Sequence, residues 1–145
     1  MSSYFKIKSV KLPEDFPERL VVVDDDPDMR ALVRECVKSQ RPEQMIVTCG
    51  SGAELISRYR ELRPDLVLLD LIMPGMNGPD TIEKLRTMPE AEGLPIIFLT
   101  GKKAIEMQDL YNKLDVQGVI YKPFGGPQEF VEKISECWRK FQKSD

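Results

Sequence analysis

Five short apolar runs, spaced at similar intervals, restrict the fold of this 145-residue chain more than any other feature of its sequence. The runs are LVVV (20–23), MIV (45–47), LVLL (66–69), IIFL (96–99) and VIY (119–121). Each is rich in β-branched or other large apolar residues and is bounded by proline, glycine or charged residues. Such runs are typical of strands that are buried on both faces of a parallel sheet.

The segments that follow these runs carry apolar residues at helical spacing, which marks the buried face of an amphipathic helix. Proline at 27, 79 and 127 supports helix starts there, and Ser51 with Glu54 fits a capping box. Asp26 is the expected N-cap of the first helix. The five apolar stripes comprise Met29, Leu32, Val33, Cys36 and Val37; Leu55, Ile56, Tyr59 and Leu62; Ile82 and Leu85; Ile105, Leu110 and Leu114; and Phe130, Ile134, Cys137 and Phe141.

Regular alternation of strand and helix predicts an α/β fold, in which right-handed crossovers place helices on both faces of a parallel sheet. We expect three αβα layers around a five-stranded sheet in the flavodoxin-like order 2-1-3-4-5. The pattern fills residues 19–145, which form one domain because a chain of this length holds only one of ordinary size. Residues 1–18 stand outside the pattern as an N-terminal extension, and arm, strand and helix all remain open for them.

Composition excludes several classes of protein. The net charge of −3 gives no electrostatic reason for this domain to bind nucleic acid. No apolar run approaches the roughly 20 residues of a membrane-spanning helix, and the N-terminus lacks the apolar segment of a signal peptide. Cys36, Cys49 and Cys137 are odd in number and widely spaced, as expected of buried thiols in a reducing compartment. We therefore expect a cytoplasmic protein without a membrane partner.

Histidine is absent from the chain. Its absence excludes histidine-based catalytic triads, histidine metal ligands and a histidine general base. The chain also cannot donate a phosphoryl group from a phosphohistidine, although it can receive one.

Charged and hydroxyl residues stand directly after four of the predicted strands. Asp24 and Asp25 follow the first strand, Asp70 the third, Thr100 the fourth and Lys122 the fifth. Parallel strands share one carboxyl edge, and the first and third strands are neighbours in the expected order. The three carboxylates should therefore meet in the crevice at the switch point of the sheet.

Converging carboxylates need neutralising, because two unit charges about 4 Å apart repel by about 4 kcal/mol at an effective dielectric constant of about 20. Lys122 supplies one positive charge, and a divalent cation with oxygen ligands, for which Mg²⁺ is suited, supplies two. A site neutralised in this way can hold phosphoryl oxygens, and a carboxylate can be the nucleophile that forms an aspartyl phosphate.

Four segments together resemble the receiver domain of two-component response regulators, of which chemotaxis regulators are an example. They are VVVDDD (21–26), VLLDLIMPGMNG (67–78), FLTG (98–101) and YKPF (121–124), in this order and about one strand-helix unit apart. The resemblance covers roughly residues 19 to 142. Each segment alone is a weak signal, whereas the ordered set is highly specific.

The resemblance implies a role for each strand-end residue. It implies Asp70 as the phosphoacceptor, Thr100 as the switch hydroxyl and Lys122 as the partner of the phosphoryl oxygens. It also implies a cis peptide bond between Lys122 and Pro123. The Mg²⁺ ligands implied are Asp25 directly, Asp24 partly through water, Asp70, and the backbone carbonyl of Ile72.

One position departs from the family pattern. The family usually has an aromatic residue three positions before the lysine, and this chain has Val119 there. Tyr121 lies two residues further on and, by strand alternation, on the same face. Either Tyr121 takes part of the aromatic role, or the switch is weaker here.

The resemblance predicts a phosphorelay receiver that takes a phosphoryl group from a sensor histidine kinase or a histidine phosphotransfer protein. Its output is expected through a partner or a homodimer at the face of the fourth helix, fifth strand and fifth helix. Such a protein promotes its own phosphorylation and dephosphorylation, and it is not an enzyme that turns over an external substrate. The alternative is a pseudo-receiver, which binds partners without phosphate.

Two further interpretations are weaker. A flavodoxin-like or phosphohydrolase enzyme is disfavoured because the chain lacks a GxGxxG turn and a DxDxT-type nucleophile loop. An EF-hand loop beginning at Asp24 is disfavoured because Met29 stands where that loop needs glycine, and a strand precedes it instead of a helix.

Overall fold

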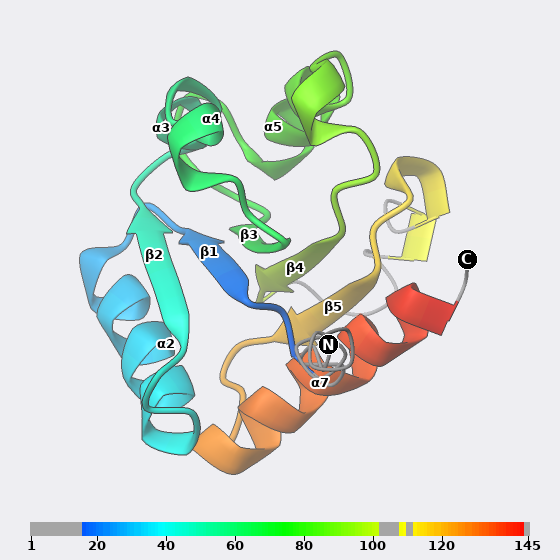
Figure 1. Cartoon of the computed structure of the whole chain (residues 1–145). Coiled ribbons are helices and arrows are strands. Elements are labelled where there is room, and N and C mark those ends of the chain that lie inside the picture. Colours follow the sequence, from blue (N-terminus) through cyan, green and yellow to red (C-terminus); the bar gives the residue numbers. More distant parts are fainter. Residues whose placement is uncertain (1–15, 102–107, 110–111, 144–145) are drawn as a thin grey trace, which may run out of the picture.

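The computed structural model describes residues 16–101, 108–109 and 112–143 (Figure 1). Its strands are β1 (Arg19–Val23), β2 (Met45–Cys49), β3 (Leu66–Asp70), β4 (Ile96–Thr100) and β5 (Gly118–Tyr121). Its helices are α2 (Pro27–Gln40), α3 (Gly52–Ser57), α4 (Tyr59–Leu62), α5 (Gly78–Leu85) and α7 (Pro127–Lys143), with a short 3-10 turn, η1 (Pro89–Ala91). All five predicted strands are confirmed, with bounds that differ by one or two residues.

The sheet is parallel throughout and has the predicted order β2-β1-β3-β4-β5. β1 lies between β2 and β3, so that Val23 is level with both Cys49 and Leu69. Every residue of β3 and β4 is buried. These strands occupy the middle of the sheet under helices on both faces, which explains why their sequences are continuously apolar.

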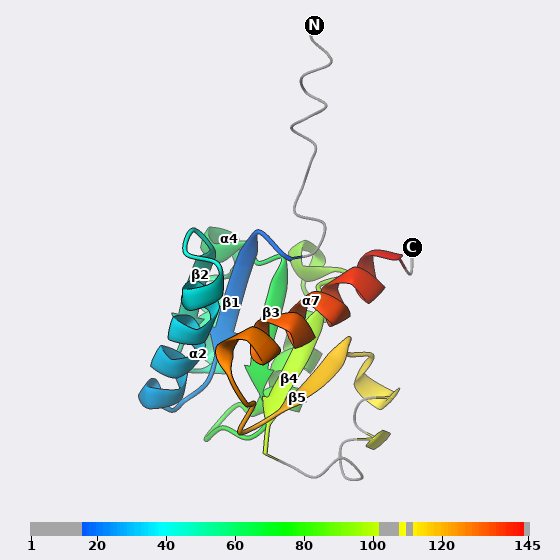
Figure 2. The ribbon, with the colours of Figure 1, turned by 90° about the horizontal axis from the view of Figure 1, so that it is seen from below.

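Helices cover the two faces of the sheet in the expected three layers (Figures 1 and 2). On one face, Val33 of α2 and Phe130 of α7 belong to a single apolar core with residues of the strands. On the other face, α3, α4 and α5 build a second core, to which Leu55 and Ile82 contribute. The sheet therefore separates two cores, and its carboxyl edge is left for polar residues.

The observed helix starts agree with the sequence signals. Asp26 is the N-cap of α2 and its carboxylate accepts a hydrogen bond from the N–H of Asp28 at 3.0 Å. Pro127 is the first residue of α7, as predicted. α5 begins one residue before Pro79, at Gly78, because the side chain of Asn77 caps it. Caps of this kind satisfy N–H groups that have no partner within the helix.

Three regions differ from the expectation or lie beyond it. The predicted second helix is divided at Arg58, where the backbone leaves the helical conformation (φ −101°, ψ 9°) and separates α3 from α4. Phe16 is fully buried in the core that α2 and α7 form with the strands, although no apolar stripe indicated it. Ile105 and Leu110 of the predicted fourth helical stripe lie outside the described residues.

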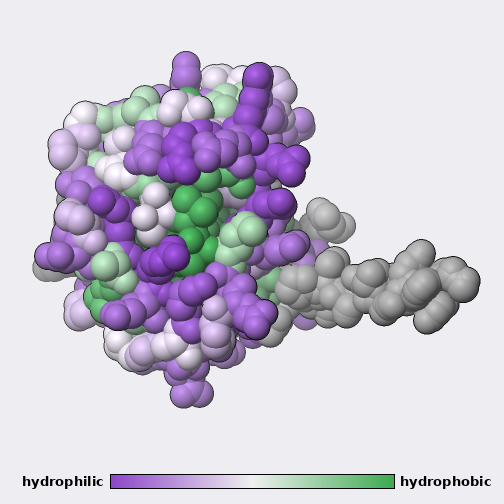
Figure 3. Space-filling view, turned by 60° about the vertical axis from the view of Figure 1, so that its left-hand side comes forward, coloured by the Kyte–Doolittle hydropathy of each residue, from purple (hydrophilic) through white to green (hydrophobic). Residues whose placement is uncertain are grey.

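β2 is an edge strand, and basic side chains of α2 bond one of its carbonyl groups and the carbonyl that directly precedes it. The carbonyl of Ile46 accepts a hydrogen bond from Arg34 Nη1 at 2.7 Å, and the carbonyl of Gln44 accepts one from Lys38 Nζ at 3.4 Å. The face that carries this edge shows a narrow hydrophobic strip between hydrophilic residues (Figure 3). Basic side chains that occupy an edge in this way oppose pairing with a strand of another molecule.

Candidate functional site

The carboxyl ends of β1, β3 and β5 bring four charged residues together. Carboxylate oxygens of Asp24, Asp25 and Asp70 all lie within 4.8 Å of one another. We call these three residues the carboxylate cluster. Lys122 Nζ lies 3.0 Å from Asp24 Oδ2 and 3.6 Å from Asp70 Oδ1. The convergence predicted from the strand ends is therefore present in the folded chain.

Hydrogen bonds fix both the backbone and the carboxylate of Asp24. It is 1% exposed, and its N–H donates to the carbonyl of Cys49 at 3.1 Å. Its own carbonyl accepts from Arg30 Nη1 at 2.7 Å, and its Oδ1 accepts from the N–H of Asp26 at 3.0 Å. Lys122 bonds Oδ2, so both carboxylate oxygens of Asp24 have a partner that orients them.

Asp70 is the last residue of β3 and is only 7% exposed. It lies at the edge of the sheet as predicted, but it is buried there. Burial raises the pKa of Asp70 from 3.8 to about 6, and the charge of Asp24 adds to this effect. The charge of Lys122 and a hydrogen bond from the N–H of Ile72 act in the opposite direction. The cluster holds three carboxylates against the single positive charge of Lys122, so negative charge is in excess there.

A divalent cation fits this arrangement. The donors of the carboxylate cluster are all hard oxygen atoms, the kind that Mg²⁺ prefers. Burial and then the charge of Asp24, the two largest causes of the raised pKa of Asp70, both disfavour its ionised carboxylate, and a nearby cation would favour it. Binding of Mg²⁺ would supply that charge.

Thr100 and Ile72 lie beside the cluster in different environments. Thr100 ends β4 and is 2% exposed, and its carbonyl accepts a hydrogen bond from the N–H of Lys122 at 2.9 Å. Ile72 has a 59% exposed side chain, and its N–H is bonded to the Asp70 carboxylate. The Lys122-Pro123 peptide bond is cis, as the family resemblance implies.

The loop that carries Ile72 is closed by Gly78. The N–H of Gly78 donates to the carbonyl of Leu71 at 2.9 Å. A Cβ atom at Gly78 would lie 2.8 Å from the carbonyl oxygen of Asp70 and 3.0 Å from Leu71 Cα. These are backbone atoms at the end of β3, and they cannot move aside without displacing Asp70. A close approach of backbone to backbone thus requires glycine here.

Replacing Gly78 by alanine is expected to lower the free energy of unfolding by about 2 kcal/mol, since the added methyl group overpacks a buried turn. Urea unfolding followed by circular dichroism measures the change. Gly101→Ala is the matched control, because Gly101 is exposed and nothing lies within 4 Å of its Cβ position, and it should change stability by less than about 0.5 kcal/mol. Equal losses in the two variants would contradict the steric explanation.

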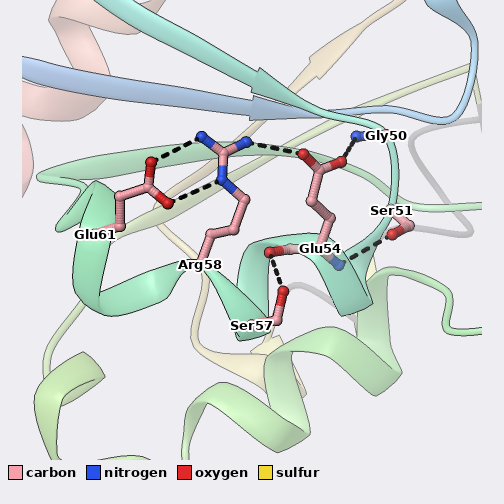
Figure 4. Close-up of polar contacts among 6 residues, drawn as sticks. All are labelled: Gly50, Ser51, Glu54, Ser57, Arg58 and Glu61. Atoms are coloured by element: carbon pink, nitrogen blue, oxygen red, sulfur yellow. Dashed lines mark hydrogen bonds and ion pairs between the residues drawn. The ribbon is translucent and has the colours of Figure 1, made fainter.

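On the other side of Asp24, the turn from β2 into α3 is organised by Glu54 (Figure 4). Ser51 Oγ accepts from the N–H of Glu54 at 3.0 Å, which is half of the predicted capping box. The other half is not formed, because the Glu54 carboxylate instead accepts from the N–H of Gly50 at 2.7 Å and pairs with Arg58 at 2.9 Å. The hydrogen bond from Gly50 is the main cause of a lowered pKa of Glu54.

Comparison with known sequences decides the family. The sequence model of the response regulator receiver domain matches residues 20–135. The chain belongs to this family. Receiver domains are signalling domains of two-component systems and are not turnover enzymes. In the described part of this receiver, no helix is both long and apolar enough to cross a membrane.

Several response regulators are similar to this receiver. It is 36% identical over 123 residues to the DNA-binding response regulator MtrA of Mycolicibacterium smegmatis. These residues make up 85% of this chain and 51% of that protein. It is 39% identical over 126 residues to the probable transcriptional regulatory protein TcrX of Mycobacterium tuberculosis, and these residues make up 86% of this chain and 51% of that protein. The chain thus spans about half the length of these curated relatives.

Solved structures agree on the fold. The chemotaxis response regulator CheY4 of Vibrio cholerae superposes with a TM-score of 0.71 at 23% identity, over 81% of this chain and 96% of that chain. A receiver of the CheY-like type from Methanospirillum hungatei gives a TM-score of 0.73 at 22% identity, over 88% and 98%.

The position without the family's aromatic residue can be located in the receiver. Val119 and Tyr121 are both half-buried and pack against the core formed by α3, α4 and α5. Ile120, between them, faces the opposite core. Strand alternation therefore places Val119 and Tyr121 on one face, as predicted.

Arg30 contacts the site of the receiver and was not identified from sequence patterns. An arginine in the first turn of a helix is placed unfavourably with respect to the helix dipole. An arginine so placed in the sequence, six residues after Asp24, indicates that its guanidinium has a specific acceptor.

Proposed function

We propose that this receiver accepts a phosphoryl group on Asp70 and that Mg²⁺ is held by Asp24, Asp25, Asp70 and the carbonyl of Ile72. The donor is a phosphohistidine of a sensor histidine kinase or a histidine phosphotransfer protein, or a small phosphodonor. One observation carries the proposal: the carboxylate cluster meets Lys122 within hydrogen-bonding distance in a member of the receiver family.

In the transfer, a carboxylate oxygen of Asp70 forms a bond to phosphorus while the bond from phosphorus to the histidine nitrogen breaks. Mg²⁺, when bound, neutralises charge on the phosphoryl oxygens. In the proposal Lys122, whose Nζ lies 3.6 Å from Asp70 Oδ1, pairs with the transferred group. In the proposal Thr100, which ends the neighbouring strand β4, donates its hydroxyl to the same oxygens.

The product biases an equilibrium between two conformations, in which the Thr100 hydroxyl is drawn toward the phosphoryl group. The change is transmitted to the face formed by β5, α7 and the segment before β5, where an output partner or a second copy binds. We assign the protein to the cytoplasm, where its free cysteines stay reduced.

Incubation of the protein with acetyl phosphate and Mg²⁺ tests the proposal. Intact mass spectrometry is expected to show addition of one phosphoryl group, which requires Mg²⁺ and disappears in Asp70→Asn. Asp65→Asn is the matched control: Asp65 stands at the opposite end of β3, and its carboxylate accepts from the N–H of Arg19 at 2.8 Å, a bond that asparagine can keep. This control should be labelled as the wild-type protein is.

Lack of labelling in the wild-type protein, with the fold intact, would favour the pseudo-receiver alternative. The valine at 119 is the observation that keeps this alternative in view. A pseudo-receiver would bind its partner equally well with and without Mg²⁺ and acetyl phosphate.

A further inference from the structure

We propose that Arg30 is a positioning residue for the carboxylate cluster. Its guanidinium holds the backbone of Asp24, so that the Asp24 carboxylate keeps facing Lys122 and the other two acids. The inference rests on the proposed function and adds a residue to it that neither the strand-end pattern nor the family resemblance assigned.

The hydrogen bond from Arg30 Nη1 to the carbonyl of Asp24, at 2.7 Å, is the first support. This carbonyl belongs to a residue that is 1% exposed. A buried acceptor that loses its donor is costly, so the chain would shift to regain a partner. Because Asp24 directly follows the last residue of β1, such a shift would turn its carboxylate away from Asp70.

The guanidinium is itself held in place by the turn after β2. A Cβ atom at Gly50 would lie 3.3 Å from Arg30 Nη1 and 3.7 Å from Glu54 Oε1. The glycine therefore leaves room for both charged groups against its backbone. Glu54 is anchored there by the N–H of Gly50 and by Arg58 (Figure 4), and its negative charge attracts Arg30.

A second explanation of Arg30 makes the opposite prediction. If Arg30 acted only as a positive charge, it would repel a bound cation, and its removal would tighten Mg²⁺ binding. If it positions Asp24, its removal weakens Mg²⁺ binding, because groups that orient metal ligands typically contribute about tenfold to affinity. The sign of the change separates the two explanations.

Arg34 provides a matched control within the same helix. It lies one turn after Arg30, and its Nη1 also donates to a backbone carbonyl, that of Ile46, at 2.7 Å. The acceptor is in the edge strand β2 and not in the carboxylate cluster. Arg34→Met removes the same kind of hydrogen bond, and one arginine charge, from α2.

Isothermal titration calorimetry with Mg²⁺ on the full chain tests the proposal, and urea unfolding checks that each variant is folded. We expect Arg30→Met to raise the Kd for Mg²⁺ about tenfold. Arg30→Lys, which keeps the charge and a hydrogen-bond donor on a long side chain, should recover part of the affinity. Arg34→Met should bind Mg²⁺ as the wild-type protein does.

Binding by Arg30→Met that is equal to or tighter than that of the wild-type protein would overturn the proposal. Equal weakening in Arg30→Met and Arg34→Met would also overturn it, because the effect would then be a general loss of helix anchoring. Failure of the wild-type protein to bind Mg²⁺ contradicts the proposed function itself, which distinguishes that outcome from failure of the role of Arg30.

Discussion

The Asp70→Asn variant is expected to be more stable than the wild-type protein by about 3 kcal/mol at pH 8 in the presence of a chelator. Burial, and then the charge of Asp24, raise the pKa of Asp70 from 3.8 to about 6 in the folded chain. At pH 8 the folded state must therefore carry an ionised carboxylate that the unfolded state carries more easily. Asparagine has a similar shape and removes this charge.

The gain should depend on pH in a defined direction. Between pH 3.8 and about 6 the folded wild-type protein binds more protons at Asp70 than the unfolded chain does. Its stability consequently falls as pH rises through this window, and the loss is complete above it. The stability difference between Asp70→Asn and wild type should thus be small below pH 3.8 and should reach its full size above about pH 7.

Urea unfolding of both proteins across this pH range measures the difference. Adding Mg²⁺ at 100 times its Kd should stabilise the wild-type protein by about 2.7 kcal/mol. It should stabilise the variant far less, because one anionic ligand is gone. Asp65→Asn, at the other end of β3, should follow the wild-type protein in both respects. If Asp70→Asn is less stable than wild type at pH 8 without Mg²⁺, the fold does not disfavour the ionised carboxylate of Asp70.

Replacing Lys122 by methionine is expected to destabilise the metal-free protein by about 3 kcal/mol at pH 8. Lys122 Nζ pairs with Asp24 at 3.0 Å and with Asp70 at 3.6 Å, and its side chain is 22% exposed. Methionine preserves much of the apolar stem but leaves two buried carboxylates without their cation. Removal of one partner of a buried ion pair is costly because the remaining charge stays desolvated.

Mg²⁺ should restore much of the stability that Lys122→Met loses, since the cation replaces the missing charge. The loss should also be smaller when Asp70→Asn is already present, and a double-mutant cycle measures this coupling. Lys133→Met is the control, because Lys133 pairs with Glu129 at 3.9 Å while both side chains are largely exposed, so the pair contributes little. Equal losses of stability in Lys122→Met and Lys133→Met would show that the buried ion pairs of Lys122 contribute no more than an exposed pair.

The strands, most helix starts and the charged residues at the strand ends follow from local patterns. Apolar runs such as LVLL (66–69) predict strands because parallel strands are buried on both faces, and this signal is contained in consecutive residues. Asp24, Asp70, Thr100 and Lys122 could be grouped because each ends a strand, and parallel strands end at one edge. The order of the strands and the family resemblance placed them next to one another.

Contacts between elements were decided only in the folded chain. The amino-acid pattern marks which face of an element is buried, but it carries no distance between side chains of different elements. Burial of Asp70 to 7% exposure, and hence its raised pKa, depends on how β3 packs beneath its loop. The hydrogen bond from Arg30 to Asp24 depends on the angle at which α2 leaves β1. Local periodicity thus identifies the chemical groups, while the packing of helices on the sheet sets their distances, and electrostatic energies depend on those distances.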